Sequence, residues 1–303
     1  MKFIKLVTLL VLTNLLFAKD LDIKTIAFAQ DDMSNDFRKA QVVEGQIEAK
    51  KHPHIKYIYS DAKAQTSRLI ANIDKYIQME VDCIIVGAND ENALNTVLAK
   101  AHKKGVNVII LDRGVTTDKY TTFINSNNIE IGTIGAKYVA KKLNNKGLVL
   151  LFEGLQKADV TKLRTKGFMD EISKHKNIKV IKRTGNYLRR DAIVEMEKLI
   201  RAGIRVDAVF AESDSMVSGV RSVLLKHNID PGSIITVGCD YTSEAQDAIR
   251  KGSQTGSVLF PLGTTQSVQT AIKIFNGQKV PKHIVIPVKL VTKENVDMVK
   301  PIF

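Results

Sequence analysis

Residues 108–114 combine an apolar run with an acid and a guanidinium, in the order Val-Ile-Ile-Leu-Asp-Arg-Gly. The apolar part predicts a buried strand, and in open α/β sheets ligands bind just beyond the carboxyl ends of the strands. There Asp112 could accept two hydroxyl protons while the guanidinium of Arg113 donates. The pair suits a small polyol such as a sugar. The competing interpretation is a pair that only caps a loop.

Three other strand-like runs also end in acidic residues. Asp31 follows residues 25–30, and Asp240 follows the run of residues 235–239. The run of residues 209–211 is followed by Glu212, Ser213 and Asp214. Four such strand ends in one chain predict a shared polar cleft. The alternative interpretation of each acidic residue, taken alone, is that it caps the N-terminus of a helix. This alternative has most weight for Asp31 and Asp214.

Sugar recognition also needs a flat apolar surface against which the C–H face of the ring packs. The chain has no Trp, which leaves Phe37, Tyr241 and Phe260 as platforms. Phe37 precedes Arg38 shortly after the first predicted strand. An ordinary core contact is the alternative interpretation of Phe37.

Signals for catalysis and for metal binding are weak. The chain has no Gly-x-Ser-x-Gly elbow, no P-loop and no Gly-x-Gly-x-x-Gly after a strand, so we expect neither an enzyme nor a cofactor. His52 and His54 form the one close histidine pair, in a Lys-rich loop without carboxylate or Cys partners. We therefore expect no metal site.

Strand-like runs alternate with helical patterns along the whole chain, which predicts an α/β fold with parallel sheets and crossover helices. Residues 92–103, for example, place Ala93, Val97 and Ala101 on one helical face before Gly105. The ten predicted strands are residues 25–29, 55–59, 83–86, 108–111, 121–124, 147–152, 178–182, 208–210, 234–238 and 257–260.

Ten strands fit two sheets better than one. We expect the chain to cross between two α/β lobes near residues 125–128, 261–263 and 287–291, which would form a hinge with a cleft above it. The predicted N-terminal lobe comprises residues 19–125 and 261–288. The predicted C-terminal lobe comprises residues 126–260 and 289–303.

The first residues have the layout of a secretory signal peptide. Lys2 and Lys5 precede an apolar stretch, residues 6–17, and Ala18 then precedes the polar Lys19. We expect cleavage near Ala18 and an exported protein. The rest of the chain has no apolar run approaching the roughly 18 residues of a membrane span.

Composition narrows the class of partner. The 303 residues are 44% hydrophobic and carry a formal net charge of +13. The Lys residues are spread along predicted helices without interleaved aromatics, and export argues against DNA, so we expect a solvated surface and no nucleic acid. Cys83 and Cys239 lie in strands of different halves, and we expect two separate thiols.

With these residues laid out, the chain resembles the periplasmic sugar-binding proteins of the ribose and galactofuranose type. The similarity covers nearly all of the sequence after residue 18. Residues 108–114 resemble the family's strand ending in Asp-Arg, and Phe37-Arg38 its aromatic-Arg pair. Three further segments carry the resemblance: residues 163–168, 211–216 and 237–240.

The resemblance implies a periplasmic protein whose two Rossmann-like lobes, joined by three crossings, close on a monosaccharide and deliver it to an ABC permease. Asp112 would accept sugar hydroxyls, Arg113 and Arg164 would donate to sugar oxygens, and Asp240 would complete the site. The predicted ligand-binding residues are Phe37, Arg38, Asp112, Arg113, Arg164, Ser213, Asp214, Asp240 and Phe260.

Three departures from the family pattern bear on the ligand. Ser213 stands where the family has an Asn, Leu259-Phe260 where the ribose branch has a polar amide, and Gly87-Ala88 where that branch has an Asn. A pocket with fewer amides and one more aromatic predicts a different pentose, a furanose or a sugar-derived signal.

Other functions remain as alternatives. The basic surface and the altered pocket also fit a periplasmic partner of a membrane sensor kinase or chemoreceptor. A sugar-responsive repressor shares this fold, but the export signal and the lack of an N-terminal helix-turn-helix disfavour it. An exported α/β enzyme is the least supported alternative.

Overall fold

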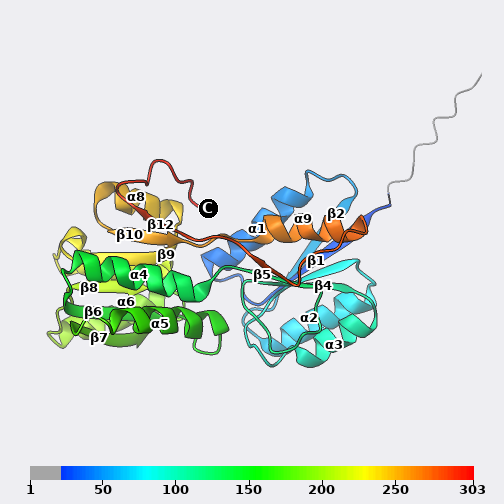
Figure 1. Cartoon of the computed structure of the whole chain (residues 1–303). Helices are drawn as coiled ribbons and strands as arrows, with labels where there is room; N and C mark the ends of the chain where they lie inside the picture. The colour runs from blue at the N-terminus through cyan, green and yellow to red at the C-terminus, as the bar shows by residue number, and fades with distance from the viewer. Residues whose placement is uncertain (1–21) are drawn as a thin grey trace, which may run out of the picture.

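The computed structural model describes residues 22–303 and shows two α/β lobes side by side, each built on a six-stranded sheet (Figure 1). The predicted fold class is confirmed. The predicted signal peptide, residues 1–18, lies outside the described residues.

The N-terminal lobe holds a fully parallel sheet of order β11-β5-β4-β3-β1-β2. Its strands are β1 (Lys24–Gln30), β2 (Ile55–Asp61), β3 (Cys83–Gly87), β4 (Asn107–Leu111), β5 (Thr122–Asn125) and β11 (His283–Val285). Its helices are α1 (Asp36–Ala49), α2 (Thr66–Gln78), α3 (Asn95–Lys103) and α9 (Thr264–Phe275).

The C-terminal lobe repeats this plan in the order β12-β10-β9-β8-β6-β7, with β12 antiparallel to β10. Its strands are β6 (Lys146–Glu153), β7 (Asn177–Thr184), β8 (Ala208–Ala211), β9 (Ile235–Asp240), β10 (Gly256–Leu259) and β12 (Lys289–Thr292). Its helices are α4 (Asn128–Lys142), α5 (Asp159–Ile172), α6 (Arg189–Arg201), α7 (Asp214–Lys226), α8 (Ser243–Lys251) and the 3₁₀ turn η1 (Pro231–Ser233).

Helices cover both faces of each sheet, which explains the continuous apolar runs of the central strands. In the N-terminal lobe α1 and α9 pack on one face and α2 and α3 on the other. In the C-terminal lobe α4 and α5 oppose α6 and α7. All five residues of β3 are buried, and each such Ile or Val contributes about 1.5–3 kcal/mol to folding.

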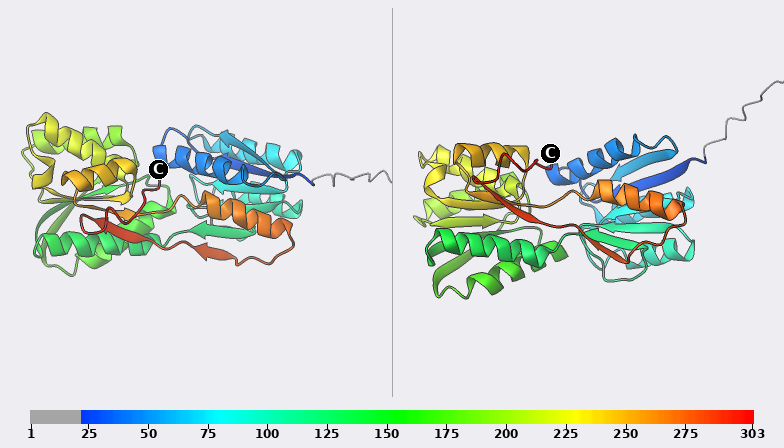
Figure 2. Two further views of the ribbon diagram at one scale, coloured as in Figure 1. Left: turned by 90° about the horizontal axis from the view of Figure 1, so that it is seen from above. Right: turned by 45° about the horizontal axis from the view of Figure 1, so that its top comes forward.

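The chain passes between the lobes three times, as predicted: from β5 to α4, from β10 to α9 and from β11 to β12 (Figure 2). The two sheets have equivalent strand orders, and β4 and β9 occupy the same place in each. Asp112 and Asp240 therefore lie at equivalent strand ends that face each other across the hinge. The exact residue ranges assigned to each lobe stay a prediction.

One local prediction was wrong, and two strands were not predicted. β11 and β12, on either side of the third crossing, are absent from the ten predicted strands. The helix expected from residue 92 begins at Asn95, because the carboxylate of Asp90 accepts the N–H groups of Asn92 and Ala93 (2.9 and 3.2 Å) and holds them in a turn.

Cys83 and Cys239 are buried and free in different lobes, so the prediction of two separate thiols is confirmed. Among residues 22–303, none of the helices combines the length and the apolar character needed to cross a membrane.

Candidate functional site

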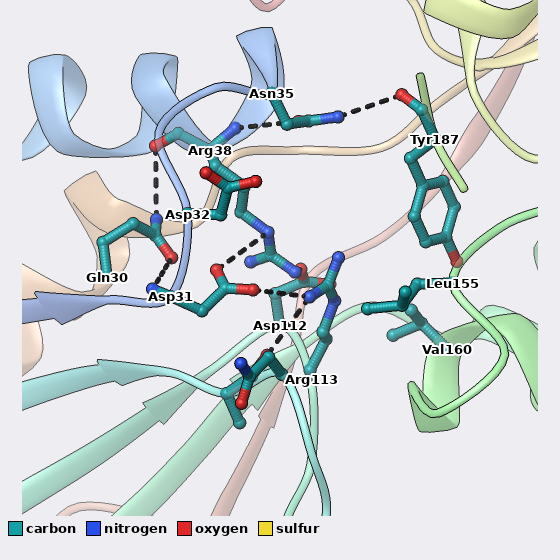
Figure 3. Close-up of polar contacts among 12 residues, drawn as sticks. Gln30, Asp31, Asp32, Asn35, Arg38, Asp112, Arg113, Leu155, Val160 and Tyr187 are labelled. Carbon is teal, nitrogen blue, oxygen red and sulfur yellow. Dashed lines mark hydrogen bonds and ion pairs between the residues drawn. The ribbon is translucent and has the colours of Figure 1, made fainter. Parts of the chain in front are cut away.

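A narrow cavity of about 30 Å³ lies between the lobes, at the carboxyl ends of both sheets. Eight of the nine predicted ligand-binding residues line it: Phe37, Arg38, Asp112, Arg113, Arg164, Ser213, Asp240 and Phe260. Asn35, Val160 and Tyr187 complete the lining, and Figure 3 shows the face built mostly by the N-terminal lobe.

Strained backbone aims the two acids into this cavity. Asp112 directly after β4 has φ 67°, and Asp240 at the end of β9 has φ 105°. Non-glycine residues rarely adopt these angles, and they persist where the surrounding structure enforces them, often at binding sites. The N–H of Asp112 donates to the carbonyl of Ile124 (2.8 Å), and the N–H of Arg113 donates to that of Leu111 (2.9 Å). The turn is therefore held by both β4 and β5.

Asp112 offers one free oxygen rather than two. Nη2 of Arg38 lies 2.7 Å from Oδ2 of Asp112, which uses that oxygen. Oδ1 of Asp112 is buried and has no hydrogen-bond partner among the described residues. A buried acceptor without a partner is costly, and a ligand hydroxyl would satisfy it.

Asp31 connects the two arginines of the N-terminal lobe. Its Oδ2 accepts from Nη1 of Arg113 at 2.8 Å, and its Oδ1 lies 3.7 Å from Nε of Arg38 (Figure 3). Asp31 does not cap α1, because the side chain of Asn35 accepts the N–H of Arg38 (3.2 Å) instead. Burial raises the pKa of Asp31, while the two guanidiniums oppose that rise.

Arg164 is a buried donor from the opposite lobe. Its Nε donates to Oδ1 of Asn128 (2.8 Å) and its Nη1 to the carbonyl of Glu212 (2.7 Å). Its Cζ lies 4.4 Å from the ring centroid of Phe260, within cation–π range. Within residues 22–303 no carboxylate lies within 4.0 Å of this guanidinium. The cation is therefore positioned by neutral partners.

Asp240 faces Arg164 without touching it. Burial raises the pKa of Asp240 well above its usual value, although the charge of Arg164 opposes the rise. Burial also lowers the pKa of Arg164, but surrounding negative groups, Asp240 and Asp112 among them, raise it above its ordinary value. Arg164 therefore stays charged, while Asp240 can accept a hydrogen bond or, when protonated, donate one.

The two phenylalanines form the apolar wall of the cavity. Phe37 and Phe260 stack with ring centroids 5.2 Å apart and an interplanar angle of 16°. Phe37 also packs into a small apolar cluster with Ile131 and Cys239, so the core-contact interpretation holds alongside its place in the lining. Tyr241 is fully buried and its hydroxyl bonds to the carbonyl of Val296 (2.9 Å), so the prediction that it is a platform was wrong.

Ser213 and Asp214 separate in the structure. Ser213 lines the cavity and caps α7, accepting the N–H of Met216 at 3.3 Å. Asp214 lies behind the cavity, where its carboxylate accepts from the N–H of Tyr241 (2.7 Å) and the hydroxyl of Ser257 (2.8 Å). Asp214 is thus neither the cap of α7 nor part of the lining, and its place is structural.

Tyr187 was missed because nothing in the sequence distinguishes it. It lies in the loop between β7 and α6 with φ 63°, outside any periodic pattern. Its ring centroid lies 5.6 Å from Cζ of Arg113 and 5.9 Å from Cζ of Arg164, so it contacts one arginine from each lobe. Its hydroxyl forms a 2.7 Å hydrogen bond with Thr161.

Residues 26–279 match the family model described as a periplasmic binding protein domain. The chain belongs to the periplasmic binding protein family. The predicted relationship to sugar-binding proteins of the ribose and galactofuranose type is confirmed, as is the expectation of a binding protein rather than an enzyme.

Three relatives show the range of this similarity. The ribose import binding protein of Bacillus subtilis is 29% identical over 89% of this chain and 88% of its own. A solute-binding protein from Bacillus halodurans with bound myo-inositol has a TM-score of 0.86 at 27% identity, covering 92% of this chain and 98% of its own. The fructose-binding periplasmic domain of a hybrid two-component system has a TM-score of 0.83 at 26% identity, covering 90% and 91%.

In this binding protein the narrow cavity opens beside a wider one of about 460 Å³, which shares Asn35, Arg38, Arg113 and Tyr187 with it. A hollow of about 730 Å³ lies elsewhere, between the start of β1 and the end of α9, and holds none of the predicted site residues. The interlobe cavities are the ones that gather the polar groups.

Glu212 supports the site of this binding protein from behind. Its carboxylate accepts from the N–H of Gly154 and the hydroxyl of Thr165, both at 2.8 Å, and lies 3.5 Å from the Tyr187 hydroxyl. Burial raises the pKa of Glu212 to about 7. Within the described residues no group of three or more His, Cys, Asp or Glu could hold a metal ion.

Proposed function

We propose that this binding protein captures a monosaccharide, a pentose, hexose or furanose, in the cleft between its lobes and delivers it to the permease of an ABC transporter. The observation that carries the proposal is a set of buried polar atoms, without hydrogen-bond partners in the described part of the chain, at the two adjoining interlobe cavities. Asp112 Oδ1, Asp31 Oδ1 and Arg113 Nε are buried without a hydrogen-bond partner among residues 22–303.

A sugar matches this set because each hydroxyl both donates and accepts. In the proposal, Asp112 Oδ1 accepts one hydroxyl proton, and Arg113 and Arg164 donate to ring and hydroxyl oxygens. Asp240 binds a further hydroxyl from the second lobe. The stacked rings of Phe37 and Phe260 pack against the C–H face of the sugar.

Capture requires the lobes to move. A volume of about 30 Å³ holds about one water, whereas sites for small molecules span about 300–1,000 Å³. To admit a sugar, the lobes would rotate apart around the three crossings. The arginine side chains that now fill the cavity would move aside. For this motion we assign residues 19–125 and 261–288 to one lobe, and residues 126–260 and 289–303 to the other.

Transport also fits the predicted cellular location. We propose that residues 1–18 are a signal peptide cleaved near Ala18, and that the mature protein works in the periplasm. The relatives support the ligand class, since one is a ribose import protein and another was solved with myo-inositol.

A second candidate role is ligand sensing. The similarity to a fructose-binding domain of a two-component system favours it, because that relative uses the same fold in a sensor. Deletion of the gene separates the two roles. Loss of growth on the bound sugar supports transport, whereas intact uptake with lost sugar-dependent transcription supports sensing.

The ligand prediction is tested by thermal unfolding with a panel of pentoses, hexoses and furanoses. One sugar at about 100 times its Kd should stabilise the protein by about 2.7 kcal/mol, a rise in Tm of a few degrees. Asp112→Asn should abolish this rise, because an amide has one acceptor oxygen and cannot serve both Arg38 and a sugar hydroxyl as the two carboxylate oxygens do.

The control is Asp118→Asn, an exposed acid whose partner is Lys119. It should leave the rise in Tm unchanged. An equal rise in the parent and in Asp112→Asn would show that the proposed site is wrong.

A further inference from the structure

The N-terminal end of α5 reaches across the cleft to the loop that carries Asp112 and Arg113. Oδ2 of Asp159, the first residue of α5, accepts the N–H of Gly114 at 2.8 Å. Its other oxygen accepts the N–H of Val160 at 2.8 Å. One carboxylate of the C-terminal lobe thus binds the backbone immediately after the Asp112-Arg113 turn of the other lobe.

The absence of a Cβ at position 114 leaves room for this approach. A Cβ on Gly114 would lie 2.8 Å from Oδ2 of Asp159 and 3.5 Å from the ring of Phe123. The first distance is shorter than real Cβ contacts, so an alanine here would displace the carboxylate from the N–H of residue 114. Gly114 and Asp159 form a matched pair across the cleft.

Two other polar contacts cross the cleft nearby. The side-chain amide of Asn35 donates to the carbonyl of Tyr187 at 3.1 Å, and Lys162 pairs with Glu91 at 2.7 Å. The Lys162 side chain is 56% exposed, so this ion pair contributes little. Asp159 differs, since it is half-buried and burial raises its pKa, so its bond to Gly114 is less accessible to water. Charge-assisted bonds to backbone N–H groups are among the stronger hydrogen bonds.

We propose that Asp159 is a positioning residue that latches the closed lobes and fixes the Asp112-Arg113 turn in its binding orientation. The latch forms only when the lobes meet, because its donor and its acceptor lie on different lobes. It therefore couples closure to the geometry of the turn. The link to ligand capture rests on the proposed function, whereas the latch itself does not.

The latch is tested without any sugar. Spin labels on cysteines introduced at the exposed positions Arg68 and Lys198 report the distance between the lobes, since the native thiols are buried. The parent should show a closed population by pulsed electron spin resonance. Asp159→Ala should reduce the ratio of closed to open molecules about tenfold, the effect of one charged hydrogen bond.

Gly114→Ala provides an independent variant, because it blocks the same contact from the other lobe. It should lower the closed population as Asp159→Ala does, and the double variant should show no further loss, since both changes remove one interaction. Asp170→Ala is the control: it removes an exposed acid of the same helix, whose partner is Lys166, and should leave the distances unchanged.

Two results would overturn the latch: a parent that is entirely open without sugar, or unchanged distances in both Asp159→Ala and Gly114→Ala. The panel of sugars then tests the coupling. If the parent binds a sugar, Asp159→Ala should weaken that binding about tenfold, mainly through faster release. A parent that binds no sugar but loses its closed population in both variants would contradict the proposed function and leave the latch standing.

Discussion

Buried acids at strand ends have two different roles in this protein. Among the described residues, Asp112 has one oxygen without a hydrogen-bond partner, whereas the carboxylate of Asp214 accepts the N–H of Tyr241, directly after β9, and the hydroxyl of Ser257. The sequence pattern places both beside the cleft but cannot say which atoms remain free. That depends on Arg38 reaching Asp112 from α1 and on β10 bringing Ser257 to Asp214.

This difference predicts that two similar variants differ in their effect on sugar binding. Asp214→Ala should lower the free energy of unfolding by about 3 kcal/mol, because it leaves buried donors of Tyr241, Ser257 and Gln254 without their acceptor. Asp112→Ala should also lower it, because Arg38 loses its buried partner, but it should in addition abolish sugar binding, which Asp214→Ala should leave measurable. Urea unfolding with and without the bound sugar measures both effects. Sugar binding that is kept in Asp112→Ala and lost in Asp214→Ala would reverse the assignment.

Glu212 predicts a dependence of stability on pH. Its pKa is about 7 in the folded protein against an ordinary 4.5, because burial disfavours the charged carboxylate. The folded state therefore holds an extra proton between pH 4.5 and 7, and the free energy of unfolding should fall by about 3 kcal/mol as pH rises through that window.

Glu212→Gln is neutral at every pH and nearly the same shape, so its free energy of unfolding should not show this fall. Urea unfolding of parent and variant at several pH values between 4.5 and 7 measures the difference, since the other buried acids are common to both. Parallel pH curves for the two proteins would rule out the role of Glu212.

At the scale of elements, the crossing of α4 and α5 positions Arg164. A Cβ on Gly132 would lie 2.1 Å from the carbonyl oxygen of Arg164, and one on Gly167 would lie 2.0 Å from that of Ile129. Backbone atoms cannot yield as side chains do, so the two glycines set how closely the helices approach. Arg164 lies one turn before Gly167 on α5.

Gly167→Ala should therefore push α5 outward, destabilise the fold by about 1–3 kcal/mol and weaken sugar binding about tenfold. Gly219→Ala is the matched control, since its Cβ would lie 2.7 Å from the carbonyl of Arg189 at the crossing of α6 and α7. Gly219→Ala should lower the free energy of unfolding but leave the affinity for the sugar unchanged. Calorimetric titration and thermal unfolding of both variants measure this difference, and equal affinities would contradict it.

The central elements could be predicted because buried parallel strands are short apolar runs, as β3 and β4 are. β12 could not, because half of its residues are not buried and its partner β10 is distant in sequence. The start of α3 could not be predicted because it depends on a turn held by the Asp90 side chain. The place of Tyr187 in the site could not be predicted because it depends on a loop conformation with positive φ. These features arise from local hydrogen bonds and long-range contacts rather than from periodicity.

At the scale of the whole molecule, two sheets of equivalent strand order meet at a hinge of three crossings. That duplication brings Asp112 and Asp240, each at the end of the equivalent strand, to one cavity. It also makes closure the event that assembles the site, because Arg113 and Arg164 come from different lobes and meet at Tyr187.

A crystal structure with the sugar found in the panel tests this account most directly. We expect closed lobes with the sugar between Phe37 and Tyr187, one hydroxyl within hydrogen-bond distance of Asp112 Oδ1 and another of Arg164. A sugar bound outside the cleft, for instance in the 730 Å³ hollow beside Lys24 and Phe275, would contradict the account.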